Sequence, residues 1–463
     1  MSVKARILDT LDELRRHARQ QGYTVELLYH EEDSHLMRFA NSAISLNTNE
    51  HLVRLDVTAH MERKRASYGL IADPADLDGM RAGIDIAGEM VEHARPLTYE
   101  PTVPVYEQTF VDETGYDPVL AGLGNQERLD YMNAAVEGLE SEDIKLSGIF
   151  SCGSNIVAVT NTNSEHSLYF RTSDAQITAV LAHVIEKWEV IAEQSAQNTG
   201  ELDPAPLRQE LAFLLDLYQR ETPQQLPLGT YDVILGPAAT AELVSMMNWI
   251  GFSGGSMKRG FSFLSEDEVG QQVFSSQFDL IDDPARLETY PYKMDLTGIP
   301  RKRYPIFEGG VFRGFVWFQD DADEFGAEPT GHTVFHKSLV IGSGDREIGS
   351  LQELVDMPRQ SDVLYIPFLH YMNIVNPSKG IMTATSRFGT LLLKADGSVA
   401  IPFNVRLTQS LRNIFGEQVD WLSKGTVAYN TSDSYGRRNP TAIVVPSFIK
   451  IDGLEISHSN AAF

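Results

Sequence analysis

The spacing of apolar residues changes near the middle of the chain, across the segment Thr222–Leu228. Before this segment, apolar residues recur every three or four positions in several stretches, for example Val3–Ala18 and Pro204–Tyr218, which predicts amphipathic helices. After it, short apolar runs are separated by Gly, Pro, Asn and Asp, which is typical of strands joined by turns. The segment itself contains Pro223 and Pro227 and has no apolar period. We therefore expect a domain boundary there.

This change of pattern predicts an α+β protein. Residues 1–222 are expected to form an N-terminal mixed α/β domain, and residues 229–463 a largely antiparallel β C-terminal domain. A strand over Tyr231–Leu235 and a helix from Pro237 to about Ile250 are expected to open the second domain. The total of 463 residues agrees with two or three domains of ordinary size.

The charge balance argues against nucleic acid as a direct partner. The chain has 38 basic and 64 acidic residues, which gives a net charge of −26. A chain this acidic repels a polyanion unless it carries a local basic patch. The densest basic clusters, Arg63–Arg65 and Arg301–Arg303, are short and lie beside acidic stretches. We therefore expect solvated surfaces there.

The same composition favours a cytoplasmic protein. The single cysteine, Cys152, cannot form an internal disulfide, which points to a reducing compartment. No apolar run approaches the roughly 20 residues that are needed to cross a bilayer. The first 20 residues predict a helix dense in charge, which is unlike a secretory signal. We expect no membrane partner.

A series of short motifs carries a family resemblance over nearly the whole chain. In the second half these motifs are YDVILGPAATAELV, GFSGGSMKRGFSFL, LIDDP, MDLTGIP, EGGVFRG, TGH and VNPSKG, and in the first half MRFANSAISLNTNE. Each motif is mainly a pattern of turn residues, and the specificity comes from their order and spacing. Together they resemble the TldD/PmbA metalloprotease family, also called modulators of DNA gyrase.

The resemblance implies that this chain is of the zinc-free kind. TldD-type members carry His-Glu-x-x-x-His on the helix after the first strand of the second domain, and TldE (PmbA) members lack it. In this chain the three positions hold Ser245, Met246 and Ile250. A zinc peptidase needs imidazole, carboxylate or thiolate ligands and a base that activates water, and these side chains supply neither. Cys152 lies far in sequence from the family's ligand cysteine. No metal is therefore expected in this chain, and no catalytic residue is assigned.

The resemblance further implies a partner-dependent function. A TldE-type subunit pairs with a TldD-type chain that holds zinc, and the two help to hold and degrade or trim unfolded peptides. The partner could instead be a second copy of this chain. Two alternatives remain open: a homodimeric metallopeptidase with non-standard ligands, and a non-catalytic binding or regulatory protein.

Two segments are candidates for peptide binding. The glycines of Ser253–Ser256 could let a peptide backbone approach, so we select Gly254, Gly255 and Ser256, although a tight turn after a helix is the simpler reading. His332 matches the family's Thr-Gly-His position, which suggests a pocket. His332, His336 and His370 are also weak alternative metal ligands.

One segment imitates the zinc motif letter for letter. His30–His35 reads His-Glu-Glu-Asp-Ser-His, but it lies between two strand-like runs in the first half of the chain. Residues five apart on a regular helix point about 140° from each other, so the two histidines could not share a metal there. We expect a hairpin turn with solvated polar side chains.

Overall fold

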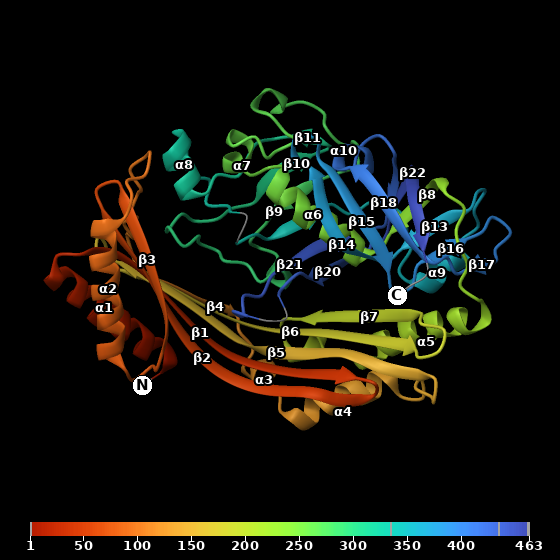
Figure 1. The fold of residues 1–463 in the computed structure, drawn as a ribbon, viewed down its shortest axis with the longest axis horizontal. Coiled ribbons are helices and arrows are strands. Elements are labelled where there is room, and N and C mark those ends of the chain that lie inside the picture. The colour runs from red at the N-terminus through yellow and green to blue at the C-terminus, as the bar shows by residue number, and fades with distance from the viewer. Residues whose placement is uncertain (1, 334–335, 434–435, 461–463) are drawn as a thin grey trace.

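The structure is a computed structural model, and it describes residues 2–333, 336–433 and 436–460. Figure 1 shows a long, curved sheet from the first half of the chain that extends beneath the second half. Helices and strands alternate in the first half, and strands dominate the second. The predicted α+β class, with an α/β region followed by a strand-rich region, is confirmed.

The first half forms one sheet. Its strands are β1 (Thr24–Ala40), β2 (Ala43–Met61), β3 (Lys64–Ala72), β4 (Phe110–Gly115), β5 (Ile144–Asn161), β6 (Ser167–His183) and β7 (Glu189–Ala196). They follow the order β3-β2-β1-β5-β6-β4, and β7 pairs with β6. The helices are α1 (Val3–Gln21), α2 (Leu77–His93), α3 (Pro118–Ala121), α4 (Asn125–Val136), α5 (Pro204–Arg220) and the 3₁₀ turn η1 (Thr199–Glu201).

Local signals explain where the first helix begins and ends. The Ser2 hydroxyl accepts a hydrogen bond from the Ala5 amide and caps the N-terminus of α1. Gly22 ends the helix with a φ of 78°, a conformation that glycine adopts without strain. The buried stripe of Ile7, Leu11 and Leu14 packs in one cluster with residues of β1, β2 and α2. The helix expected at the N-terminus is confirmed.

The second half forms two further sheets. Its strands are β8 (Gly229–Leu235), β9 (Leu280–Asp282), β10 (Tyr304–Glu308), β11 (Val311–Phe312), β12 (Leu339–Ile341), β13 (Val363–Ile366), β14 (Phe368–Asn376), β15 (Ile381–Arg387), β16 (Leu391–Leu393), β17 (Val399–Ala400), β18 (Asn404–Ser410), β19 (Val419–Leu422), β20 (Thr426–Asn430), β21 (Ala442–Pro446) and β22 (Ile449–Asn460). One sheet has the order β11-β10-β9-β12-β21-β20, and the other β14-β15-β18-β22-β8-β13-β16-β17, with β19 beside β22. The pairing is mainly antiparallel, but β12 with β21 and β13 with β8 run parallel.

Short helices connect these strands. They are α6 (Pro237–Ile250), α7 (Gly254–Lys258), α8 (Gln319–Phe325), α9 (Leu351–Asp356), α10 (Leu411–Ile414) and the 3₁₀ turns η2 (Glu266–Glu268), η3 (Leu287–Thr289) and η4 (Pro377–Lys379). The strand and helix expected at the start of the second half correspond to β8 and α6. No helix of the described residues is long and apolar enough to span a bilayer.

The two halves share an apolar core. One buried cluster combines Leu181 and Leu211 from the first half with Ile234, Leu354 and Phe448 from the second. The halves are therefore held together by ordinary core packing, since apolar area removed from water stabilises both. The boundary expected at residues 222–228 lies in the connection from α5 to β8 and stays a prediction about chain organisation.

The expectation of a turn at His30–His35 is wrong. Strand β1 continues through this segment and pairs along it with β2 on one side and β5 on the other. Its polar side chains are paired instead of solvated: His30 Nε2 lies 2.7 Å from Asn155 Oδ1, and Arg54 Nη1 donates to Glu32 Oε1 at 3.0 Å. Because hydrogen-bond partners on neighbouring strands satisfy His30 and Glu32, these side chains can be buried in the middle of the sheet.

Candidate functional site

Helix α6 is the helix on which the resemblance places the metal-binding positions, and in this chain they hold Ser245, Met246 and Ile250. Ser245 and Met246 are partly buried, and Ile250 is 4% exposed in the core of the second half. Glu242 is the carboxylate on the same helix face as Ser245 and Met246. Among the described residues there is no group of three or more His, Cys, Asp and Glu side chains that could hold a metal. The residues at this place therefore do not fit a zinc ion.

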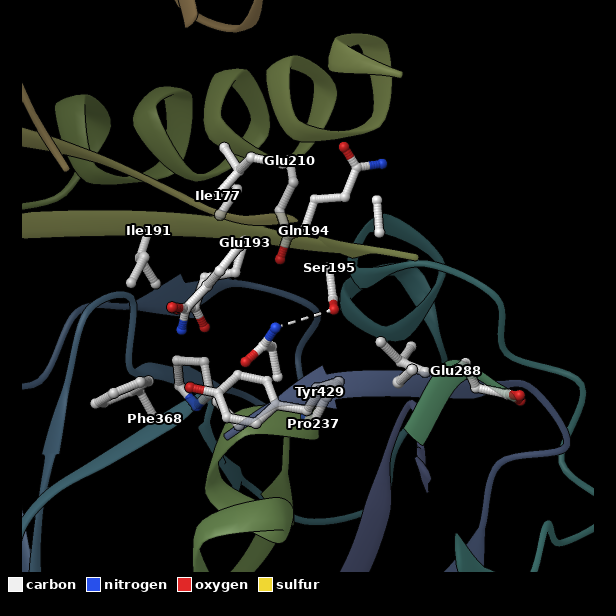
Figure 2. A pocket seen from close by; sticks show the side chains of 18 of the residues that line it. Ile177, Ile191, Glu193, Gln194, Ser195, Glu210, Pro237, Glu288, Phe368 and Tyr429 are labelled. Carbon is white, nitrogen blue, oxygen red and sulfur yellow. Dashed lines mark hydrogen bonds between the residues drawn. The ribbon is translucent and has the colours of Figure 1, made fainter. Parts of the chain in front are cut away.

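A cavity of about 400 Å³ lies close to the N-terminus of this helix, between the two halves of the chain. Figure 2 shows Glu193, Gln194 and Ser195 of β7 on one side, and Tyr429 of β20 with the start of α6 on the other. Helix α5 contributes Glu210. The cavity is thus formed only when both halves of the chain come together.

Two strand edges face each other across this cavity. Strand β7 pairs with β6, and β20 pairs with β21, but β7 and β20 form no ladder with each other in the described part of the chain. One end is closed by a bridge: Asn430 Nδ2 donates to Ser195 Oγ at 3.3 Å, and Ser195 Oγ lies 2.8 Å from the Tyr290 hydroxyl. Elsewhere the strand edges remain accessible to an extended ligand.

Two glutamates in the cavity titrate far from their ordinary range. Burial, opposed in part by hydrogen bonds from the Thr178 and Tyr429 hydroxyls, raises the pKa of Glu193 to about 7. The Glu210 side chain is exposed to water. Even so, the protein atoms around its carboxyl group disfavour the charge and raise the pKa of Glu210 to about 7 as well. The charges of Glu210 and Glu242 raise the pKa of Glu193 further. Groups poised near neutrality in a cleft mark a candidate binding site.

The Lys337 ammonium interacts with Glu242, the carboxylate of helix α6. Burial raises the pKa of Glu242, and the Lys337 ammonium opposes this change. Burial lowers the pKa of Lys337 to about 8, against the influence of Asp282 and Glu242. Neither residue belongs to the lining of the cavity. The Lys337 ammonium therefore offsets the charge of Glu242 but does not enter the cavity.

His332 lies in a buried network away from the cavity. Its Nδ1 is 2.8 Å from Asp282 Oδ2, and Asp282 Oδ1 accepts from Arg301 Nη2 at 2.5 Å and from the Ser338 amide at 2.9 Å. Burial opposes the charge of Asp282, but Arg301 and His332 hold the pKa of this carboxyl below its usual value. His332 is 2% exposed and is absent from the cavity lining. Its predicted contact with substrate stays a prediction.

The Gly/Ser segment has a packing role. The simpler reading, a tight turn after a helix, is wrong in part, because the segment also opens helix α7, where the Ser253 hydroxyl accepts a hydrogen bond from the Ser256 amide at 3.3 Å. A Cβ on Gly254 would lie 2.5 Å from the Trp317 ring, and one on Gly255 2.1 Å from the Asp321 carboxylate. These glycines therefore allow close contact with neighbouring side chains. A peptide-binding role for Gly254, Gly255 and Ser256 stays a prediction.

The other candidate histidines lie apart from His332. His336 packs against Tyr292 with ring centroids 4.6 Å apart, and burial together with the Arg301 charge lowers its pKa to about 4. His370 lies on the edge strand β14 and contacts the Tyr371 ring. Within the residues that the structure describes, His332, His336 and His370 do not form a metal-sized group.

Sequence reasoning missed the residues that line the cavity. Glu193, Glu210, Tyr365 and Tyr429 come from four separate segments of the chain. The weak signal that could have revealed Glu193 is a carboxylate within an otherwise apolar or neutral strand, Val190–Ala196. None of the others belongs to a local motif.

Comparisons with known proteins place the fold. The family model described as the PmbA/TldA metallopeptidase C-terminal domain matches residues 228–458. No curated protein sequence matches the chain. Among solved structures, the chain is similar to TldE from Thermococcus kodakarensis, with a TM-score of 0.79 and 17% identity over 97% of this chain and 100% of that one.

Two further solved structures share the fold. A candidate modulator of DNA gyrase from Bacteroides thetaiotaomicron has a TM-score of 0.77 and 16% identity, over 97% of this chain and 98% of its own. One from Thermotoga maritima has a TM-score of 0.73 and 14% identity, over 97% of this chain and 100% of its own. At such identities the likeness concerns the fold alone.

Proposed function

This chain belongs to the TldD/PmbA family, and on that premise we propose that it is the zinc-free subunit of a TldD/TldE-type peptidase. It binds unfolded peptides in extended form and pairs with a TldD-type chain, which carries out their hydrolysis. The buried cysteine Cys152 agrees with a reducing compartment, and we place the complex in the cytoplasm.

The side chains of α6 carry this proposal. A catalytic zinc site needs three protein ligands and leaves one position for water. At the corresponding places on α6 this chain has Ser245, Met246 and Ile250, and Ile250 is committed to the core. A hydroxyl, a thioether and a buried alkyl group cannot replace two imidazoles and a carboxylate base. Hydrolysis therefore requires chemistry from another chain.

The strand edges beside the cavity support the peptide-binding part of the proposal. An extended peptide can add to an exposed sheet edge through main-chain hydrogen bonds, which do not depend on its sequence. The free edges of β7 and β20 lie on opposite sides of a cavity of about 400 Å³. Unfolded chains offer their main-chain groups to such edges, whereas folded proteins have already paired theirs.

The test is zinc content and peptide cleavage of the purified full chain, alone and with a TldD-type chain. We expect less than about a tenth of a zinc ion per chain, because a set of neutral non-ligand side chains gives no affinity. We also expect no cleavage alone, and cleavage after the partner is added. A size-exclusion measurement of the mixture reports whether the two chains form a complex.

Other outcomes would support the alternatives. One zinc per chain with cleavage activity would favour a homodimeric metallopeptidase, and variants of His332, His336 and His370 would then identify the ligands. A tight complex with an unrelated protein, without peptide turnover, would favour a regulatory protein. Either result would overturn the proposed function.

A further inference from the structure

We propose that the cavity between β7 and β20 recognises a primary ammonium group, carried by the N-terminus or by a lysine side chain of a bound peptide. This inference rests on the proposed peptide-binding function and adds a chemical preference to it. The cavity lies beside two free strand edges, so one ligand can pair with an edge and place a charged group inside.

The charge of the lining favours a cation. The described residues that line the cavity include four glutamates and no lysine, arginine or histidine. Two of these glutamates are already engaged: Glu288 pairs with Arg286 at 2.6 Å, and Glu201 accepts from the Gln197 amide at 2.7 Å. Glu193 and Glu210 have no cationic partner among the described residues. Glu193 is only partly buried and Glu210 is exposed, but the protein atoms around both carboxyl groups disfavour their charges, and a cationic ligand would offset this effect.

Two unused polar groups point independently to a ligand. Tyr365 lines the cavity and is 3% exposed, yet its hydroxyl makes no hydrogen bond to any residue that the structure describes. Glu210 likewise has no hydrogen-bond or ion-pair partner in the described part of the chain, and its side chain extends from α5 toward the cavity in Figure 2. Tyr365 and Glu210 both line this cavity. Buried polar groups are normally satisfied, so the Tyr365 hydroxyl lacks a partner that a ligand would supply, and the more exposed Glu210 carboxylate lies beside the same cavity.

The number and type of acceptors match an ammonium group. An ammonium has three N–H donors and no acceptor. Glu193, Glu210 and the phenolic oxygen of Tyr365 provide acceptors of suitable chemistry. Apolar side chains, among them Ile177, Ile191 and Leu214, line the rest of the cavity and suit the methylene groups of a lysine. Because the described carboxylates do not form a metal-sized group, a divalent cation is a poorer match.

The experiment compares four extended hexapeptides of otherwise neutral sequence by calorimetric titration into the purified full chain at pH 8. One has a free N-terminus, one is N-acetylated, one is N-acetylated with a single lysine, and one has norleucine in place of that lysine. We expect each peptide with an ammonium group to bind about tenfold more tightly than its uncharged counterpart, the usual effect of a charge-assisted hydrogen bond. The two pairs show which source of the ammonium the cavity prefers.

Single variants locate the effect. Glu193→Gln and Glu210→Gln should each reduce the preference for ammonium, measured as the ratio of the charged to the uncharged peptide's affinity, to about threefold or less. The matched control is Glu347→Gln, which removes one charge from an exposed pair with Lys424 and should leave the preference intact. Circular dichroism confirms that each variant is folded.

The outcomes separate this inference from the proposed function. Equal binding of charged and uncharged peptides would overturn the ammonium site and leave peptide binding in place. No binding of any peptide to the folded chain would overturn both. A preference that survives in both glutamate variants would place the cation elsewhere on the chain and would also overturn the inference.

Discussion

Two acidic regions of this protein, one buried around Asp282 and one at the cavity of Glu193 and Glu210, give their carboxylates opposite surroundings. Asp282 has a guanidinium, an imidazole and a backbone amide within 2.9 Å, and its pKa is lowered. Glu193 and Glu210 have no cation beside them, and burial raises the pKa of each to about 7. Both regions lie between elements that are distant in sequence. The fold thus surrounds the Asp282 carboxylate with cationic and hydrogen-bonding partners. It gives Glu193 and Glu210 no cationic partner among the described residues.

The difference shows which acidic group belongs to the scaffold. A buried ion pair with all hydrogen bonds made fixes the relative position of β9, β12 and the segment around His332. Carboxylates with raised pKa values weaken the folded state at neutral pH, so their retention in a cavity suggests a task other than stability. His332, although it matches a family motif, lies in the first of these regions.

Removal of the Asp282 charge should have the largest effect. Asp282→Asn leaves the Arg301 guanidinium, whose side chain is fully buried, without its counter-ion. We expect the free energy of unfolding to fall by roughly 3–5 kcal/mol, the usual loss when one partner of a buried pair is removed. Urea denaturation at pH 7 measures it. A loss below about 1 kcal/mol would show that the pair does not act as the scaffold.

Removal of the Glu193 charge should have the opposite sign. The pKa of Glu193 is about 7 in the folded chain and near 4.5 in the unfolded one, so the unfolded chain releases its proton first. Stability is therefore lost as the pH rises from 4.5 to 7. Glu193→Gln should raise the free energy of unfolding at pH 8 by about 1–2 kcal/mol, after allowance for partial exposure. Urea denaturation at pH 5 should show little change.

Ammonium binding should strengthen as the pH rises. Glu193 and Glu210 gain their charges near pH 7, while an amine stays protonated up to about pH 8 at an N-terminus and about pH 10 on lysine. The affinity for the lysine peptide should rise about three- to tenfold from pH 5.5 to pH 8. Tyr290, Tyr365 and Tyr429 also line this cavity, whereas Glu242 and Lys337 lie outside its lining, and Glu242 acts on Glu193 through its charge. A flat profile would contradict the role of the two glutamates.

The smallest effect is expected at an exposed pair. Glu347 and Lys424 form an ion pair at 2.7 Å, but their side chains are 78% and 63% exposed. Glu347→Gln should change the free energy of unfolding by less than about 0.5 kcal/mol, because water screens such pairs. The same urea measurement provides the baseline for the two acidic regions. A larger change would mean that removal of any charge alters the free energy of unfolding. The effects at Asp282 and Glu193 could then not be assigned to their surroundings.

Helices α1, α5 and α6 were predictable because their signals are local. Apolar residues at helical spacing and a cap within a few positions define each one, as Ser2 and Gly22 do for α1. That Ser245, Met246 and Ile250 supply neither imidazole nor carboxylate was equally plain, because side-chain chemistry needs no tertiary information to read. The strand-rich character of the second half followed from its short apolar runs.

The central part of β1 could not be predicted in this way. From the sequence alone, the polar run His30–Glu32 suggests a turn, because charged side chains are rarely buried. Arg6 comes from α1, Arg54 from β2 and Asn155 from β5, and together they supply the hydrogen bonds that make burial possible. Likewise, the packing of Gly254 against the Trp317 ring involves a residue more than 60 positions away.

The sequence by itself determined the family, the α+β class and the absence of histidine and cysteine from α6, because each depends on residue identity and short-range spacing. Only the tertiary structure decided which carboxylates are paired and which are poised. Glu193, Glu210, Tyr365 and Tyr429 acquire their properties from neighbours that the fold brings together across the two halves. Desolvation and charge interactions depend on distance in space, and distance along the chain does not encode them.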